Sequence, residues 1–147
     1  MTNLNPIEIL LVEDNPNDAE LTLRALKKQK LANPVHVAED GEEALDFIFC
    51  RGRYAERNPS IPLKVILLDL KLPKINGLEV LRELKSDDRT KKLPVVIITS
   101  SREDPDIKAA YELGANSYVV KPVDFPSFLD AMSQIGMYWL VVNESPK

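Results

Sequence analysis

The sequence predicts an α/β fold in which a doubly wound, five-stranded parallel sheet carries helices on both faces. Five short apolar runs, rich in β-branched residues and without polar alternation, are typical of strands covered on both sides. Each run is followed by a stretch whose apolar residues recur at helical spacing, so strand and helix alternate five times. In such sheets, ligands bind at the carboxyl ends of the strands.

Length and charge limit the classes of protein to consider. The 147 residues suit one domain, and the composition of 44% hydrophobic and 29% charged residues is that of a globular protein. We therefore expect a single domain over residues 1–147 without an output domain. The net charge of -4, from 23 acidic and 19 basic residues, disfavours nucleic-acid binding, which usually requires a basic surface.

Cysteine content and the N-terminal residues predict a cytoplasmic location. Cys50 is the only cysteine, so the chain has no internal disulfide and no thiolate zinc site. Residues 1–6 lack the basic and apolar segments of a signal peptide, and no run approaches the ~20 apolar residues that cross a bilayer. We expect no membrane contact.

The first β-α unit begins with the apolar run Ile7 to Val12, which reads as a buried strand ending at Glu13-Asp14. Asn17 or Asp18 can cap the helix that follows. The apolar residues of this helix are Leu21, Ala25 and Leu26, and the lysines at its end are Lys27, Lys28 and Lys30.

The second and third units repeat the pattern. Val35 to Ala38 is a short strand, and a helix from Gly41, with Ala44, Leu45 and Ile48 as its apolar residues, ends near Gly52. After a polar stretch from Arg51 to Pro62, the block Val65 to Leu68 forms a strand that ends at Asp69. The helix Gly77 to Ser86 carries Val80, Leu81 and Leu84 on one stripe.

The last two units complete the sheet. The run Val95 to Ile98 stops at Thr99, and a helix starts at Asp104-Pro105 and stops at Gly114. Strand Ser117 to Val120 is closed by Lys121-Pro122. The final helix is predicted from Phe125 to about Val142, with Phe128, Leu129, Met132 and Ile135 facing the core.

The residues that directly follow the strands indicate a chemical site. Glu13-Asp14, Asp69, Thr99 and Lys121 should meet in one crevice at the carboxyl edge of the sheet. Neighbouring carboxylates repel one another unless a cation lies among them, and oxygen ligands suit Mg²⁺. A lysine and a hydroxyl beside that ion can stabilise a transferred phosphoryl group, and Asp69 can act as its nucleophile.

These residues lie in segments that resemble the receiver domains of two-component response regulators. The matching segments are Leu11 to Asp14, Leu67 to Pro73 with Asn76-Gly77, Pro94 to Thr99, and Gly114 to Pro122. They are spread over nearly the whole chain. The resemblance implies a flavodoxin-like (βα)5 receiver fold in a phosphorelay protein that is not a separate enzyme, but assists its own Mg²⁺-dependent phosphorylation and dephosphorylation.

The resemblance also implies a role for each site residue. Asp69 is the phosphoacceptor, and Lys121 and Thr99 bind the phosphoryl oxygens. The Mg²⁺ ligands are Asp14, Asp69, Glu13 largely through water, and the backbone carbonyl of Lys71. Tyr118 is the switch residue that turns inward when the Thr99 hydroxyl moves, and Pro122 follows Lys121 in a cis linkage. Lys71 occupies a position at which many members of the family have a smaller polar residue, so we expect its side chain to alter the lifetime of the phosphorylated state.

The polar insert Arg51 to Pro59 and the segment Tyr138-Trp139-Leu140 narrow the resemblance to the stand-alone regulators of bacterial phytochrome histidine kinases. The expected partner is therefore a histidine kinase of the phytochrome type, although a different histidine kinase stays open. We also expect a phosphorylation-strengthened homodimer through the final helix, the helix Asp106 to Leu113 and the strand between them. The apolar residues expected there are Ile107, Tyr111, Tyr138 and Trp139. Alternatively, the aromatic end folds back on its own core and the protein stays monomeric.

Other classes of protein fit less well. An aspartyl phosphohydrolase usually has a second acid two residues after its nucleophile, where this chain has Lys71. A flavin or nucleotide module needs a Gly- or Ser/Thr-rich first loop, whereas residues 13–17 carry two acids. A receiver that no longer takes phosphate would have lost one of the site residues. His36 has no cysteine or second histidine nearby in the sequence with which to form a metal site, so we expect it to be a surface or packed histidine. Cys50 is expected to be a small hydrophobic residue.

Overall fold

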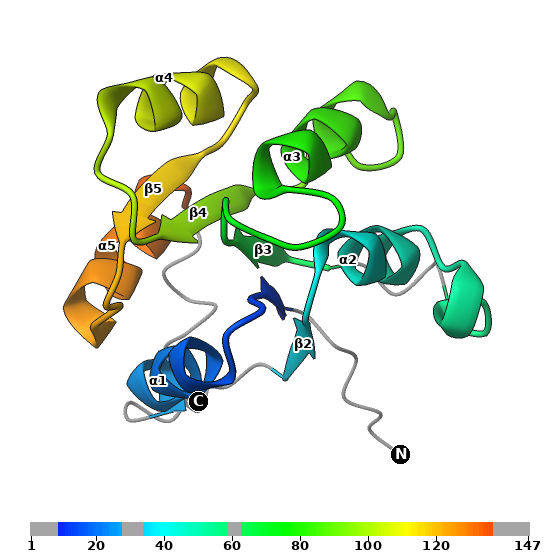
Figure 1. The fold of residues 1–147 in the computed structure, drawn as a ribbon, viewed down its shortest axis with the longest axis horizontal. Coiled ribbons are helices and arrows are strands. Elements are labelled where there is room, and N and C mark those ends of the chain that lie inside the picture. Colours follow the sequence, from blue (N-terminus) through cyan, green and yellow to red (C-terminus); the bar gives the residue numbers. More distant parts are fainter. Residues whose placement is uncertain (1–8, 28–33, 59–62, 137–147) are drawn as a thin grey trace, which may run out of the picture.

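The computed structural model describes residues 9–27, 34–58 and 63–136. Their five parallel strands form one sheet in the order β2-β1-β3-β4-β5 (Figure 1). The strands are β1 (Ile9–Val12), β2 (Val35–Ala38), β3 (Val65–Leu68), β4 (Val95–Thr99) and β5 (Ser117–Val120). This doubly wound order confirms the predicted fold class and its flavodoxin-like topology.

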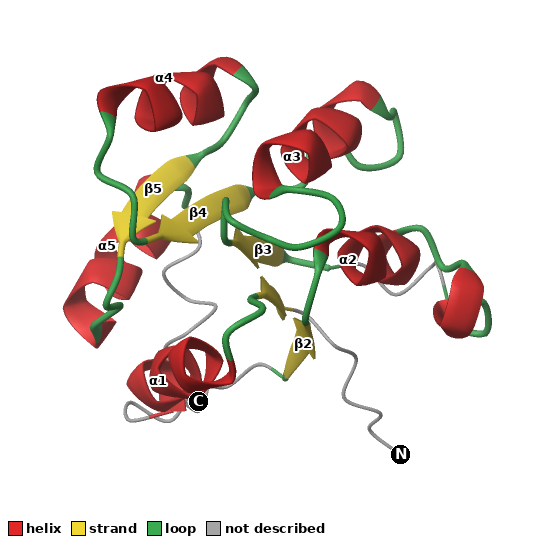
Figure 2. Ribbon diagram, viewed as in Figure 1, coloured by secondary structure: helices red, strands yellow, loops and turns green. Residues whose placement is uncertain are grey.

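Helices cover both faces of the sheet (Figure 2). They are α1 (Pro16–Lys27), α2 (Gly41–Ile48), α3 (Gly77–Ser86), α4 (Asp104–Glu112) and α5 (Phe125–Gln134), with a short 3-10 helix η1 (Gly52–Tyr54) after α2. Successive side chains of each strand point to opposite faces, so β3 sends Val65 and Leu67 toward α1 and α5, and Ile66 and Leu68 toward α2, α3 and α4. All four are fully buried. The uninterrupted apolar runs are therefore explained by two cores.

The start of α1 differs from the prediction. The helix begins at Pro16, and the Asn15 side chain accepts hydrogen bonds from the backbone N–H groups of Asn17 and Asp18. Asn15 is thus the capping residue, and proline fits the first turn because its missing N–H is not needed there. The buried stripe of α1 consists of Ala19, Thr22 and Leu26, and the predicted core residue Leu21 is 52% exposed.

The end of α5 also differs. We predicted a helix to about Val142, but α5 stops at Gln134 with Ile135 as its C-terminal cap. Gly136 has a φ of 77°, a left-handed conformation that glycine adopts at little cost and that commonly ends helices. Of the predicted core-facing residues, Phe128 and Met132 are buried and Ile135 is half-buried. Residues 137–142 lie outside the described part of the chain.

The polar insert packs on the edge of the sheet through Tyr54 of η1. Its hydroxyl donates to Glu43 Oε2 at 2.5 Å and lies 3.1 Å from Nε2 of His36. His36 stacks on Phe47 with ring centroids 4.3 Å apart. Burial and the bond to Glu43 raise the pKa of Tyr54 to about 12, and burial lowers the pKa of His36. His36 is thus a packed histidine; Cys50 is half-buried, with its Sγ 3.2 Å from Arg57 Nη1.

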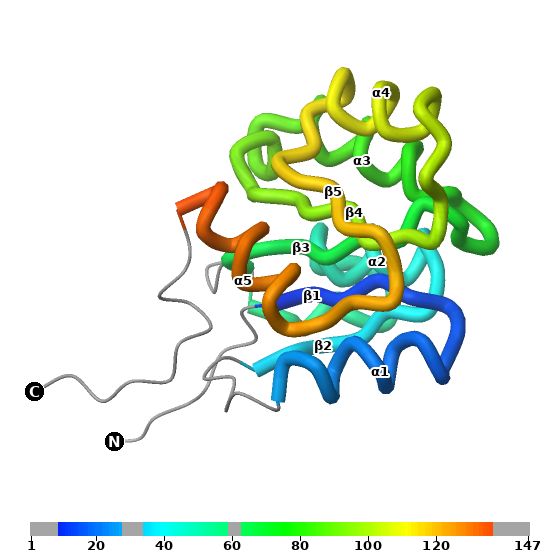
Figure 3. The backbone as a smooth tube through the Cα atoms, turned by 90° about the vertical axis from the view of Figure 1, so that its left-hand side faces the viewer, coloured from blue at the N-terminus to red at the C-terminus, as the bar shows by residue number. Residues whose placement is uncertain are grey.

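The loops that leave the strands' carboxyl ends all lie at one edge of the sheet, at the right in Figure 3. This edge receives the residues that follow β1, β3, β4 and β5. None of the helices in the described ranges is both long and apolar enough to cross a bilayer.

Candidate functional site

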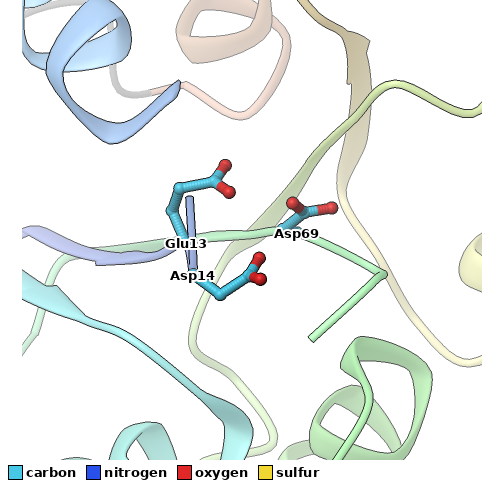
Figure 4. Close-up of side chains that lie close together, drawn as sticks. All are labelled: Glu13, Asp14 and Asp69. Carbon is cyan, nitrogen blue, oxygen red and sulfur yellow. The ribbon is translucent and has the colours of Figure 1, made fainter. Parts of the chain in front are cut away.

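Three carboxylates converge where β1 and β3 end. These strands are neighbours with Val12 opposite Leu68, so Glu13 and Asp14 follow beside Asp69. The Asp69 N–H donates to Val12 O at 3.1 Å, which keeps the two chain segments together past the strands. One carboxylate oxygen from each acid lies within 4.8 Å of the other two, and the side chains point to the same side of the strand ends (Figure 4).

Burial of the three acids is unequal. Glu13 is 2% and Asp69 5% exposed, whereas Asp14 is open to solvent. Burial raises the pKa of Glu13 above its usual value, against the opposing hydrogen bonds from Lys121 and from the Asn15 N–H, and the charge of Asp69 raises it further. A cation among these oxygens relieves that cost. An all-oxygen set with one solvent-facing acid fits Mg²⁺, which retains several waters when protein-bound.

Lys121 supplies a positive charge to the same site. Its Nζ lies 2.7 Å from Glu13 Oε1 and 2.9 Å from Oδ2 of both Asp18 and Asp69. Burial on its own lowers the pKa of this ammonium, but the hydrogen bonds to Glu13, Asp69 and Asp18 outweigh it, and the pKa lies above its usual value. The Lys121 N–H donates to Thr99 O at 2.9 Å, which holds its backbone beside β4. The peptide bond from Lys121 to Pro122 is cis, as predicted.

The loop after β3 closes tightly around Asp69. The backbone N–H of Lys71 donates to Asp69 Oδ1 at 3.2 Å, while the residue itself is exposed. Gly77 is required at the start of α3, since a Cβ there would lie 2.2 Å from the Asp69 carbonyl oxygen and 2.6 Å from Leu70 Cα. A hollow of about 420 Å³ opens beside the acids, and Asp14 and Lys71 both line it. Lys71 therefore lies near the three acids that could hold a metal ion.

Thr99 and Tyr118 are joined through Ser101. The fully buried Thr99 accepts a hydrogen bond on Oγ1 from the Ser101 N–H at 3.4 Å, and the Tyr118 hydroxyl donates to Ser101 O at 3.1 Å. The Ser101 hydroxyl donates to Asp106 Oδ2 of α4 at 2.6 Å. Burial raises the pKa of Tyr118. Thr99 ends β4, the strand beside β3, and Asp69 directly follows β3.

Two residues of this site were missed by the sequence analysis. Asp18, considered only as a helix cap, reaches Lys121 from the first turn of α1. Its position four residues after Asp14 was a usable signal, because a helix starting at Pro16 turns its first residues back toward the strand end. Ser101 acts partly through its backbone carbonyl, which no side-chain pattern can reveal.

The residues of the predicted association surface are only partly described. Tyr111 is 47% exposed, its ring centroid lies 6.5 Å from that of Tyr118, and Ile107 is half-buried. A hollow of about 360 Å³, lined in part by Tyr111 and Tyr118, runs over β5 and α5. Tyr138 and Trp139 lie outside the described residues.

Comparisons with known proteins agree on one family. The model of the family "Response regulator receiver domain" matches residues 9–133. The chain is 38% identical to the "Probable methanogenesis regulatory protein FilR2" of Methanothrix harundinacea, over 97% of this chain and 89% of the relative. It is 38% identical to response regulator Rcp1 of Synechocystis, over 92% of this chain and 90% of Rcp1.

Solved structures give the same result. The bacteriophytochrome response regulator AtBRR is 53% identical with a TM-score of 0.84, and the match covers 97% of this chain and 100% of AtBRR. A Mn²⁺-bound form of Rcp1 is 34% identical with a TM-score of 0.76, covering 97% of this chain and 100% of Rcp1.

Proposed function

Because the chain belongs to the response regulator receiver family, we propose that it accepts a phosphoryl group on Asp69 from a phosphohistidine of a partner kinase. The observation that carries this proposal is the contact at 2.9 Å between Asp69 Oδ2 and Lys121 Nζ, beside the Glu13-Asp14 pair. A nucleophile, the ammonium group of a lysine and carboxylate oxygens that can bind a metal ion thus share one partly buried space. These are the parts that phosphoryl transfer needs.

Glu13, Asp14 and Asp69, with the backbone carbonyl of Lys71, would hold Mg²⁺. The bound ion supplies charge neutralisation for the three equatorial oxygens of the moving phosphoryl group. The Mn²⁺-bound form of Rcp1 supports a divalent ion for the family. In this chain the fit rests on the donor set itself, whose carboxylate oxygens lie within 4.8 Å of one another.

In the transfer, an oxygen of Asp69 attacks phosphorus, a P–O bond forms and the P–N bond to the kinase imidazole breaks with its electron pair returning to the ring nitrogen. Lys121 binds an oxygen of the transferred group, since its ammonium already lies on the acceptor carboxylate. The Thr99 hydroxyl would bind another phosphoryl oxygen after a small movement. Both interactions strengthen as negative charge builds on the phosphoryl oxygens. Later attack of water on phosphorus restores the Asp69 carboxylate and ends the signal.

The signal would leave the site through Ser101. A movement of the Thr99 hydroxyl toward the phosphoryl group breaks its contact with the Ser101 N–H, and the Ser101 carbonyl holds Tyr118. The Ser101 hydroxyl is tied to Asp106 of α4. A change at Thr99 is therefore transmitted to α4 and β5, the surface that carries exposed Tyr111. Phosphorylation would bias this region between two arrangements.

We further propose that the kinase is of the phytochrome type and that the α4-β5-α5 surface pairs with a second copy of the chain. The similarity to AtBRR and Rcp1 supports the first proposal. Exposed Tyr111 beside the hollow over β5 and α5 supports the second. Phosphotransfer from candidate kinases tests the partner; sedimentation of the phosphorylated and unphosphorylated protein, with a Tyr111→Ala variant, tests pairing. A monomer at tens of micromolar in both states would contradict it.

The proposed function is tested by incubation with acetyl phosphate and Mg²⁺, followed by intact-mass measurement. We expect the mass of one phosphoryl group on the parent protein, none on Asp69→Asn, and none with excess chelator. The matched control is Asp88→Asn, because Asp88 is an exposed acid two residues beyond the C-terminal end of α3, whereas the site lies at the N-terminal end of this helix. Undiminished labelling of Asp69→Asn, or labelling that the chelator leaves unchanged, would refute the assignment.

A further inference from the structure

The ammonium of Lys121 has no hydrogen-bond donor to spare. An ammonium carries three N–H groups. Carboxylate oxygens of Glu13, Asp18 and Asp69 lie at 2.7, 2.9 and 2.9 Å from Nζ, and the side chain is 13% exposed. Before Lys121 can bind a phosphoryl oxygen, it must therefore release one of these three partners.

Asp18 is the partner that is easiest to release. Glu13 and Asp69 are 2% and 6% exposed at the side chain, so neither can be hydrated when the ammonium leaves it, and each would then depend on Mg²⁺ alone to balance its charge. The Asp18 side chain is 37% exposed and can be hydrated when it loses the lysine. Asp18 also lies in the first turn of α1, where the helix dipole favours a negative charge without any further partner.

We propose that Asp18 is a positioning residue that holds Lys121 in the unphosphorylated protein and competes with the incoming phosphoryl group for its ammonium. The inference rests on the proposed function of Asp69. Arrival of the phosphoryl group displaces Asp18 from Lys121, and Lys121 then binds a phosphoryl oxygen. Because Asp18 is negatively charged and shares a cation with Asp69, it also repels the phosphoryl donor before transfer.

Removal of this competitor should make phosphorylation faster. Asp18→Asn keeps the size of the side chain and removes its charge. A unit charge within about 5 Å of the donor, partly screened by solvent, changes the rate on the order of five-fold. We therefore expect Asp18→Asn to be labelled by acetyl phosphate about three to ten times faster at limiting donor, chiefly through a lower half-saturating donor concentration. Asp18→Glu, which retains the charge and can reach Lys121, should return toward the parent rate.

The matched control is Glu20→Gln on the same helix. Glu20 is exposed and paired with Arg24 at 2.8 Å, so this change removes an equal charge from α1 without touching Lys121. Its labelling rate should equal that of the parent protein. A purely structural role of Asp18 would lower labelled yield without changing the half-saturating donor concentration. Added salt should slow the parent less than Asp18→Asn, because salt also screens the repulsion that Asp18 exerts.

The outcomes separate this inference from the function on which it rests. If the parent protein is not labelled on Asp69, the proposed function and the inference both fail. If the parent is labelled and Asp18→Asn is labelled at the same rate or more slowly, only the role of Asp18 is wrong. An equal acceleration in Glu20→Gln would likewise overturn it, because the effect would then be one of net charge. Circular dichroism checks the fold of each variant, and Asp18→Ser replaces Asp18→Asn if the latter does not fold.

Discussion

Replacing Lys121 by methionine should destabilise the protein by leaving its site carboxylates without their cation. The ammonium lies within 2.9 Å of Glu13, Asp18 and Asp69, whereas methionine has a similar length and no charge. Glu13 and Asp69 are almost fully buried and so cannot be hydrated in its place. The perturbation thus creates buried, uncompensated negative charge with little change in packing volume.

The size of the effect follows from burial. Removal of one partner of a buried ion pair typically costs about 3–5 kcal/mol. We expect the lower end, about 3 kcal/mol at neutral pH without metal, since Asp18 is partly hydrated and Glu13 can take up a proton. The pKa of Glu13 is already raised by burial, so this acid is the first to protonate. An acid whose pKa is higher in the folded than in the unfolded protein lowers the stability of the protein as the pH rises between these two pKa values. The loss of stability in Lys121→Met should therefore be smaller near pH 5 than near pH 8.

Urea unfolding followed by circular dichroism measures this prediction, in chelator and in excess Mg²⁺. Mg²⁺ should stabilise Lys121→Met more than the parent protein, because the variant has lost the competing cation. The control is Lys108→Met, an exposed lysine of α4, whose free energy of unfolding should change by less than about 0.5 kcal/mol. Equal stability of Lys121→Met and parent in chelator, or a deficit that grows toward low pH, would refute the reasoning.

Three further predictions concern the scaffold. Burial lowers the pKa of His36, so the unfolded chain takes up a proton first and the protein loses stability as the pH falls below ~6.5. In His36→Gln this loss should be smaller. Urea unfolding at two pH values measures it, and an unchanged dependence of the unfolding free energy on pH would contradict the prediction. Gly77→Ala should cost about 2–4 kcal/mol in thermal unfolding, since its Cβ would lie 2.2 Å from the Asp69 carbonyl oxygen; a cost below 1 kcal/mol would contradict this close approach. Asp40→Ala should cost about 1 kcal/mol because Asp40 Oδ1 caps α2 through the Glu43 N–H at 2.7 Å; unchanged stability would exclude the cap.

The strands were predictable because both their faces are buried. The runs Val65 to Leu68 and Val95 to Thr99 are fully apolar up to their polar ends, and the structure has them as β3 and β4. Strand-helix alternation predicted a doubly wound parallel sheet, whereas the strand order β2-β1-β3-β4-β5 was expected only from the resemblance to receiver domains. Because carboxyl ends of parallel strands share an edge, the meeting of Asp14, Asp69 and Lys121 was also predictable without any knowledge of distances.

Three features could not be predicted from spacing. The helical spacing of Leu21, Ala25 and Leu26 predicted the buried face of α1, but the structure buries Ala19, Thr22 and Leu26, and which face packs on the sheet is set by tertiary contacts that spacing does not reveal. The apolar residues after Ile135 continued the helical pattern, so the end of α5 before Gly136 was not predicted. Gly136 ends the helix through its positive φ, which the sequence does not show. The spacing of Asp18 from Asp14 indicated only that Asp18 lies near the end of β1. Its contact with Lys121 joins residues 103 positions apart, through side chains that extend from different elements.

The most direct test of the account is to find the covalent bond itself. Borohydride reduces an aspartyl phosphate to homoserine, so treatment of the phosphorylated protein followed by peptide mass spectrometry marks the acceptor. We expect homoserine at position 69 alone, formed with Mg²⁺ and absent from Asp69→Asn and Lys121→Met. Homoserine at Asp14, or at position 69 to an equal extent in the presence of chelator, would contradict the site proposed here.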